Sequence, residues 1–231
     1  MKGLFISFEG TEGSGKSTQI AVLAERLQSL AHTVHRLREP GGTPIGEEIR
    51  HTLKHSDANH AMTSEAELLL MNASRAQLVR EIIRPMLAAG HVVLCDRFFD
   101  STTAYQGYGR ELDFKKISEV IDIAVGETRP DLTLLLHVPI AVSEERRRSR
   151  QTMLLEVPQK ENRQQAAPLP FTQTQRDRME EADRAFFERV EKGYQAIAAA
   201  EPARVKLLDA THSKEWVARE VWKHVEPLLP G

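Results

Sequence analysis

LFISFEGTEGSGKST, residues 4–18, joins an apolar run to the pattern G-x-x-x-x-G-K-[ST]. Residues 4–8 predict a buried strand and residues 20–30 an amphipathic helix, so the pattern lies where a phosphate-binding loop belongs. In such a loop, glycine N–H groups surround phosphate oxygens, the lysine supplies a positive charge and the serine hydroxyl reaches Mg²⁺. We expect a nucleoside triphosphate to bind the consecutive residues Gly10, Thr11, Glu12, Gly13, Ser14, Gly15, Lys16, Ser17 and Thr18.

The composition is that of a globular chain without excess positive charge: 231 residues, 41% hydrophobic, formal net charge −2. This balance argues against nucleic acid or an anionic membrane as a partner. No apolar run approaches the roughly 18 residues of a membrane span, and no signal peptide follows Met1. Cys95 is the single cysteine, which excludes an intramolecular disulfide, and its apolar surroundings predict burial. We expect one domain over residues 1–231, located in the cytoplasm and acting on small molecules.

Strand-like apolar runs alternate with segments of helical periodicity. The runs are residues 4–8, 33–37, 92–95, 132–138 and 205–208. Their alternation with helices predicts an α/β fold with a five-stranded parallel sheet covered on both faces. Polar residues follow the first three runs: the phosphate loop, Arg38 with its neighbours, and Asp96-Arg97. Because ligands bind beyond the carboxyl ends of such strands, we expect these groups to meet in one cleft.

Three further helices are predicted at residues 65–88, 176–200 and 214–228, with Pro85 kinking or shortening the first. Residues 151–175 contain three prolines and six glutamines and show no sustained period. This segment predicts a mobile loop, which is either a lid over the phosphates, spanning about residues 146–178 with its flanks, or an expanded surface loop.

The polar residues favour a small-molecule kinase over other phosphate-loop proteins. The chain has no Asn-Lys-x-Asp motif for guanine and no second motor domain. A nucleotide acceptor phosphate has a second pKa of about 6, so its oxygen is already ionised and the site needs cations more than a base. Arg38, Arg97 and the arginines near residue 150 suit this task. Asp96 either holds Mg²⁺ or restrains an arginine, and Glu12 either meets a sugar hydroxyl or is solvated.

Together these segments resemble the thymidylate kinase family, which makes dTDP from dTMP and ATP on the pathway to dTTP. The resemblance spans nearly the whole chain, and its most specific motif is DRFFDSTTAYQG at residues 96–107. Further matching motifs are FEGTEGSGKST at 8–18, REPGGT at 38–43, RAQ at 75–77, RPDLT at 129–133, DRME at 177–180 and DAT at 209–211. The resemblance implies the three-layer sandwich of P-loop NTPases with a lid insertion, Mg²⁺ as cofactor, and a homodimer.

The resemblance also implies roles for individual residues. Arg38 and Arg97 would bind the acceptor phosphate, Arg75 and Gln106 the thymine edge, and Glu12 would approach the 3′-hydroxyl. Ser101 and Met71 would belong to the same substrate site, where Tyr105 would crowd a ribose 2′-hydroxyl. Catalytic charge would come from Lys16, Arg97 and a lid arginine, for which Arg146, Arg150 and Arg178 are the candidates. Ser17 and Asp96 would organise Mg²⁺.

Two departures from the family pattern affect the substrate. Met71 stands where the family usually has a phenylalanine stacking on thymine, so Phe98 or Phe99 would have to supply any aromatic surface, and base selection could be looser. The lid region is also longer than the family pattern. A kinase for another nucleotide, such as dUMP, and a nucleotide-binding module that has lost catalysis therefore stay open as alternatives.

Overall fold

The computed structural model describes residues 3–156 and 183–229. Its one sheet has five parallel strands in the order β2-β3-β1-β4-β5. The strands are β1 (Leu4–Glu9), β2 (Val34–Arg38), β3 (Val92–Asp96), β4 (Leu132–His137) and β5 (Val205–Asp209). Each predicted apolar run is therefore a strand, with bounds that differ by no more than one residue. The predicted α/β class is confirmed.

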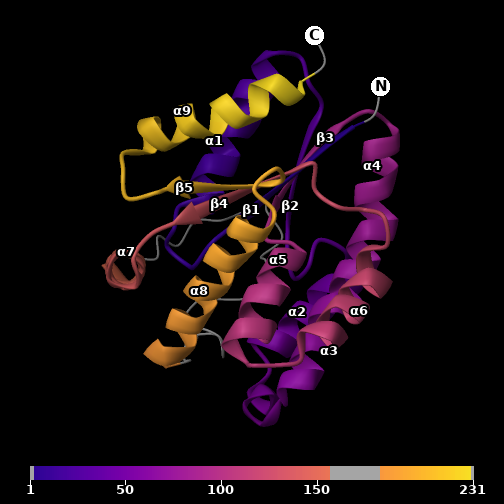
Figure 1. Cartoon of the computed structure of the whole chain (residues 1–231), viewed down its shortest axis with the longest axis vertical. Coiled ribbons are helices and arrows are strands. Elements are labelled where there is room, and N and C mark those ends of the chain that lie inside the picture. The colour runs from indigo at the N-terminus through magenta and orange to yellow at the C-terminus, as the bar shows by residue number, and fades with distance from the viewer. Residues whose placement is uncertain (1–2, 157–182, 230–231) are drawn as a thin grey trace, which may run out of the picture.

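Helices cover both faces of the sheet (Figure 1). The α-helices of the described part are α1 (Lys16–Ser29), α2 (Pro44–Lys54), α3 (Ser64–Leu78), α4 (Arg84–Ala88), α5 (Phe99–Thr102), α6 (Phe114–Val125), α7 (Ile140–Glu156), α8 (Arg184–Ala200) and α9 (Lys214–Val225). Short 3-10 segments lie at Asp57–Ala61 and Glu226–Leu228, and π-helical segments at Val79–Ile83 and Thr103–Gly109. With the sheet between two sets of helices, the architecture is a three-layer sandwich.

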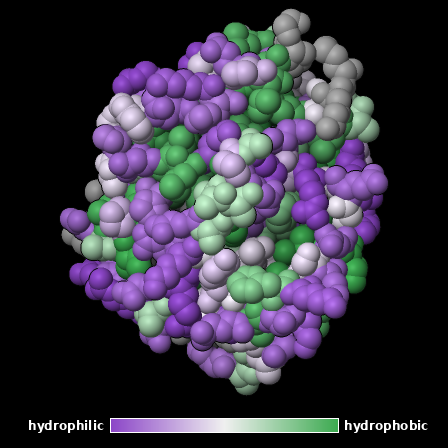
Figure 2. Space-filling model, in the orientation of Figure 1, coloured by the Kyte–Doolittle hydropathy of each residue, from purple (hydrophilic) through white to green (hydrophobic). Residues whose placement is uncertain are grey.

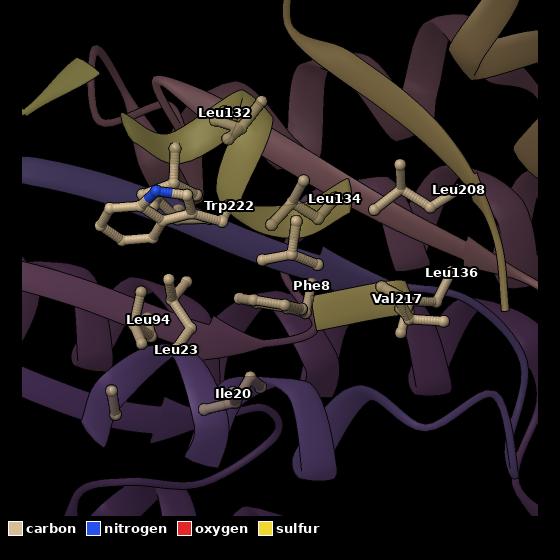
Figure 3. Packing of buried hydrophobic residues seen from close by; sticks show 14 of the residues in the cluster. Phe8, Ile20, Leu23, Leu94, Leu132, Leu134, Leu136, Leu208, Val217 and Trp222 are labelled. Carbon is tan, nitrogen blue, oxygen red and sulfur yellow. The ribbon is translucent and has the colours of Figure 1, made fainter. Parts of the chain in front are cut away.

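One core lies between the sheet and the helices α1 and α9. Phe8, Leu94 and Leu134 point from the strands toward Leu23 on α1 and Trp222 on α9 (Figure 3). The opposite face of the sheet packs against α3, α4, α6 and α8 through two further clusters. The strands β1, β3 and β4 are thus buried on both faces, which explains why they read as continuous apolar runs.

The predicted helix over residues 65–88 is interrupted before Pro85. A π-helical turn, Val79–Ile83, separates α3 from α4, and Pro85 lies in the first turn of α4. Proline has no N–H to donate to the preceding turn, so the regular helix pattern cannot continue through it. The described part of the helix predicted at residues 176–200 is α8, which begins at Arg184, where the Asp183 carboxylate accepts from the Phe186 N–H at 2.7 Å. Residues 176–182 lie outside the described residues.

The sheet topology brings the polar strand ends together. β1 is hydrogen-bonded to both β3 and β4, so the chain connections run outward in opposite directions from it. In the register of the sheet, Asp96 is opposite both Phe8 of β1 and Arg38 of β2. The residues that follow these three strands therefore emerge at the same edge, which is where a parallel sheet binds its ligands.

On the face shown in Figure 2, hydrophilic side chains dominate and hydrophobic ones form separate groups. Among the described residues, no helix is both long enough and apolar enough to cross a membrane.

Candidate functional site

A polar cleft of about 470 Å³ opens at the carboxyl edge of the sheet. Residues 12–19 of the phosphate loop and α1 form one wall, while Asp96 and Arg97 lie at the end of β3. Ala210, His212 and Lys214, which follow β5, close the opposite side. We call this space the donor cleft. Gly10, Gly13 and Gly15 have positive φ, which lets the loop turn its backbone N–H groups inward.

Lys16 is folded back against the phosphate loop. Its ammonium group donates to the carbonyl oxygens of Gly10 at 3.0 Å and Thr11 at 2.9 Å. Burial, aided by the positive charge of Arg97, lowers the pKa of Lys16 to about 8. An anionic ligand in the donor cleft would offset the cost of burying the Lys16 charge, so this position favours the binding of a phosphate.

Ser17 and Asp96 form a pair of oxygen ligands at the floor of the cleft. The Ser17 hydroxyl donates to the Asp96 carboxylate at 2.8 Å. A hydroxyl and a carboxylate are hard donors of the kind that Mg²⁺ prefers. In the described part of the chain, no three histidine, cysteine or acidic side chains gather into a metal cage. The pair therefore fits Mg²⁺ that completes its coordination with phosphate oxygens and water.

Of the predicted lid arginines, Arg146 can be placed. It extends from α7 and donates to the carbonyl oxygens of Gly13 at 3.4 Å and Ala210 at 3.0 Å, which brings its charge to the donor cleft. Arg150 belongs to the same helix, but its side chain lies outside the described residues, as do Arg178 and the whole segment 157–182.

A second, narrower cavity adjoins the donor cleft and extends from Arg97 to Gln106. We call it the acceptor cavity. Four residues line both spaces: Glu12, Glu39, Lys54 and Arg97. The predicted residues Met71, Arg75, Ser101, Tyr105 and Gln106 all line the acceptor cavity. The structure therefore brings together the acceptor residues that the sequence spreads over about 90 positions, with Arg38 in the donor cleft beside them.

Arg97 sits where the two spaces meet. Its φ of 70° lies in the left-handed region, which non-glycine residues rarely adopt and which is often found at functional sites. The guanidinium donates to the hydroxyls of Ser101 at 3.2 Å, Tyr194 at 3.2 Å and Tyr105 at 3.3 Å. These contacts are near the long end of the range for hydrogen bonds, so phosphate oxygens can compete with them.

A buried carboxylate, Glu9, lies behind these hydroxyls. It accepts from Ser101 at 2.6 Å, from Tyr194 at 3.0 Å and from the Phe98 N–H at 2.7 Å. The Tyr194 hydroxyl can therefore accept from Arg97 while it donates to Glu9. Burial and the nearby charge of Asp100 raise the pKa of Glu9 to about 7.

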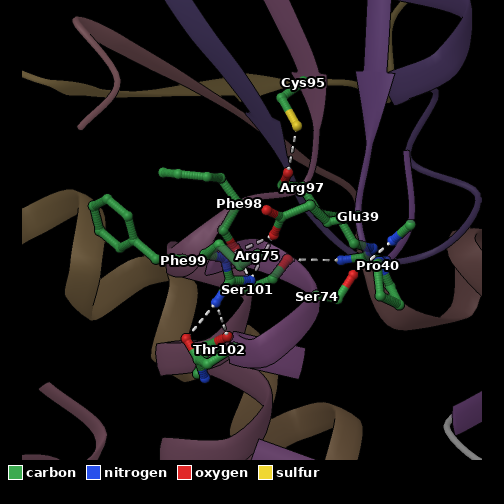
Figure 4. Close-up of polar contacts among 12 residues, drawn as sticks. Glu39, Pro40, Ser74, Arg75, Cys95, Arg97, Phe98, Phe99, Ser101 and Thr102 are labelled. Atoms are coloured by element: carbon green, nitrogen blue, oxygen red, sulfur yellow. Dashed lines mark hydrogen bonds and ion pairs between the residues drawn. The ribbon is translucent and has the colours of Figure 1, made fainter. Parts of the chain in front are cut away.

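Arg75 is held by several buried protein partners (Figure 4). Four of the five N–H donors of its guanidinium make hydrogen bonds to the carboxylate of Glu39, the side chains of Asn72 and Thr102, and the carbonyl of Phe98, and Nη2 also contacts Glu39. The Arg75–Glu39 ion pair is 2.7 Å long and its side chains are only 3% exposed. A hydrogen bond from Arg75 to a base edge would require one of these contacts to be exchanged.

Arg38 is more accessible than Arg75, Arg97 and Arg146. Its side chain is 48% exposed and pairs with Glu47 of α2 at 2.9 Å. Two residues that the sequence analysis did not single out, Arg50 and Lys54, also line the donor cleft from α2. Their spacing of four residues places them on one face of the helix, which is the pattern that could have identified them.

The base end of the acceptor cavity differs from the expectation for Phe98 and Phe99. Both are core residues, and the Phe98 ring packs edge-on against Phe5 at 4.9 Å between centroids. Besides Tyr105, the aromatic side chain that lines the cavity with Met71 is Phe187 of α8. Sequence reasoning overlooked Phe187, and likewise Tyr194 and Glu9, because apolar periodicity assigns such positions to the core.

The fold and the paired cavities define a class, the phosphate-loop kinases that act on a small acceptor. Comparisons with known sequences and structures narrow this class to one family. The sequence model described as thymidylate kinase matches residues 8–169. The chain is 45% identical to the thymidylate kinase of Syntrophotalea carbinolica over 218 residues, which cover 94% of this chain and 93% of that one. It is 43% identical to a thymidylate kinase of a Synechococcus species, covering 98% and 96% of the two chains.

The crystal structure of thymidylate kinase from Ehrlichia chaffeensis superposes with a TM-score of 0.72 at 30% identity, covering 97% of this chain and 100% of that chain. The chain belongs to the thymidylate kinase family.

Proposed function

We propose that the protein transfers the γ-phosphoryl group of ATP to the phosphate of dTMP, producing dTDP and ADP. The observation that carries this proposal is the position of Arg97, which lines the donor cleft and the acceptor cavity at once. A group bound in the donor cleft and a group bound in the acceptor cavity would therefore meet at the Arg97 guanidinium. Membership of the thymidylate kinase family gives the same activity.

On the donor side, the phosphate loop would bind the triphosphate through its backbone N–H groups, and Lys16 would turn from Gly10 and Thr11 to the phosphate oxygens. Ser17 and Asp96 would hold Mg²⁺, which when bound neutralises charge on the triphosphate. Arg146 donates to the loop at Gly13, which supports it as the candidate for the catalytic lid arginine. Arg150 and Arg178 stay predictions.

On the acceptor side, Arg97 and Arg38 would bind the phosphate of dTMP. Ser101, Tyr105 and Glu12 would surround the sugar, with Tyr105 excluding a 2′-hydroxyl. Met71 would pack on the base, and Gln106 and Arg75 would meet its polar edge. Because the acceptor oxygen is already an anion near neutral pH, no side chain has to remove its proton, and catalysis consists of alignment and charge neutralisation.

We also propose one domain over residues 1–231 and a homodimer formed through α3 and α6. Leu69 on α3 is 57% exposed and Ile123 on α6 is 75% exposed, and the two helices contact each other. Sedimentation of wild type and of Leu69→Glu tests the dimer, which should dissociate in the variant.

The single buried cysteine, Cys95, fits a reducing compartment such as the cytoplasm.

The activity is tested by ADP release from Mg²⁺-ATP with dTMP, dUMP, UMP, CMP and AMP as acceptors. We expect strong preference for dTMP, which would show that Met71 replaces a stacking ring. Preference for another acceptor would reassign the substrate. A lack of acceptor-dependent turnover would instead favour a nucleotide-binding module.

A further inference from the structure

Glu67 of α3 lies directly behind Gln106 at the base end of the acceptor cavity. Its carboxylate accepts from the Gln106 amide nitrogen at 2.8 Å. Arg110 donates to the same carboxylate through Nη2 at 3.0 Å and Nε at 3.3 Å. The Glu67 side chain is 1% exposed, so water does not compete for these contacts. Nothing in the assigned chemistry uses Glu67 or Arg110.

The chemistry of Glu67 determines how the Gln106 amide is turned. A carboxylate paired with a guanidinium accepts hydrogen bonds and donates none, so only the NH₂ end of an amide can face it. The two ends of an amide diverge from one carbon atom, and Gln106 also lines the acceptor cavity. With its nitrogen bound to Glu67, the amide presents its oxygen to a ligand.

The neighbouring arginine does not share this task in the observed arrangement. Arg75 makes four hydrogen bonds to protein groups, and its Nη2 also contacts the Glu39 carboxylate at 2.7 Å. Gln106 makes its side-chain hydrogen bond within the described residues to Glu67, and this leaves its oxygen to meet a base. An oxygen at this point accepts from the N3–H of thymine or uracil, whereas unprotonated N3 of cytosine is itself an acceptor and would be repelled.

We propose that Glu67 is a positioning residue that selects the pyrimidine through Gln106. By holding the amide oxygen toward the cavity, it favours a base with a hydrogen at N3 and rejects one without it. The proposal rests on the proposed function, since it concerns the acceptor of that reaction.

The substitution Glu67→Gln should weaken the selection by turning the Gln106 amide. Arg110 would bind the carbonyl oxygen of the new amide, which leaves the new NH₂ group facing Gln106. Gln106 would then turn its own oxygen toward that NH₂ group and present its nitrogen to the base. A donor at this point suits N3 of cytosine and opposes N3–H of thymine.

The experiment compares three acceptors by kcat/KM. 5-Methyl-dCMP differs from dTMP only at the hydrogen-bonding edge of the base, and dUMP differs only by the methyl group. We expect wild type to prefer dTMP over 5-methyl-dCMP, and Glu67→Gln to reduce this ratio about 10-fold or more, the range that one mispaired buried hydrogen bond gives. The dTMP to dUMP ratio should stay within about twofold, because both bases carry N3–H.

A double-mutant cycle separates orientation from general damage. The variant Gln106→Leu cannot form a hydrogen bond with the base. In this background, adding Glu67→Gln should leave the ratio of kcat/KM for dTMP to kcat/KM for 5-methyl-dCMP unchanged. Glu65→Gln, the same substitution at an exposed position of α3, is the matched control.

The proposal is overturned if wild type does not prefer dTMP over 5-methyl-dCMP, which needs no variant to fold. It also fails if Glu67→Gln, shown to be folded by its thermal transition, keeps the wild-type ratio or lowers both ratios together. Absence of dTMP turnover in wild type would refute the proposed function itself, so the two failures are distinguishable.

Discussion

One wall of the donor cleft is a single run of consecutive residues, Glu12 to Gln19, whereas most of the acceptor cavity is lined by side chains of α3 and of the segment after β3. The donor groups are largely backbone N–H groups shaped by glycines. The acceptor groups are long side chains, and buried carboxylates stand behind them. Glu39 pairs with Arg75, Glu9 reaches Arg97 through hydroxyls, and Glu67 holds Gln106.

This difference suggests two ways to prepare a site for anions. A backbone loop needs little support, because its dipoles are neutral and held by covalent geometry. Side-chain cations gathered in a closed space repel one another and lose hydration, so each needs a fixed partner. The acceptor cavity therefore depends on carboxylates whose partners are other protein side chains.

The largest expected effect comes from a substitution in the donor cleft. Lys16→Ala should lower kcat by about 10³-fold or more, because it removes a positive charge aimed at the transferring group. Binding of dTMP, measured by calorimetry, should change little. Lys115→Ala, at an exposed position of α6, serves as the control. Retained turnover in Lys16→Ala would refute the assigned role.

The next effect concerns folding on the acceptor side. Glu39→Ala should reduce the free energy of unfolding by about 3–5 kcal/mol, because Arg75 would be left buried without its counter-charge. Denaturant titration measures this change. Lys223→Ala breaks the exposed Lys223–Glu220 pair and should cost less than about 1 kcal/mol. Equal costs would show that burial does not distinguish the two pairs.

A smaller effect tests the link between Arg97 and Glu9. Tyr194→Phe removes the hydroxyl that contacts both, and it should raise KM for dTMP about 5- to 10-fold, as expected for one hydrogen bond to a charged group. KM for ATP should be unchanged. Tyr108→Phe, in the neighbouring π-helical segment, is the control. A parallel rise in both KM values would indicate a general disturbance.

The last expected effect is a pH dependence, which is small at each step of pH. The pKa of Glu9 is raised from 4.5 to about 7 in the folded protein, so between these values the folded state binds more protons than the unfolded state. The free energy of unfolding should therefore fall as pH rises from about 4.5 to 7, by at most about 1.4 kcal/mol per unit. Glu9→Gln should lack this contribution, while the exposed Glu119→Gln should retain it. Parallel curves for Glu9→Gln and wild type would contradict the assignment.

Much of the site could be predicted because it lies in short motifs. The phosphate loop, Arg38, Asp96 and Arg97 all follow apolar runs, so topology alone places them at one edge. The supporting residues could not be predicted this way. Tyr194 and Phe187 have the spacing of core residues on a helix, and a buried carboxylate such as Glu67 is indistinguishable in sequence from an exposed one on α3.

The sequence by itself determined the alternation of strands and helices along the chain, the phosphate loop and the class of reaction, because these depend on local patterns with strict residue requirements. Only the tertiary structure decided which partner each buried polar group has. Glu9 and Tyr194 are 185 residues apart and meet at 3.0 Å, and no local pattern encodes such a contact. Hydrogen bonding in a closed space depends on distances that folding alone sets, and in the acceptor cavity those distances hold Arg97 and turn Gln106.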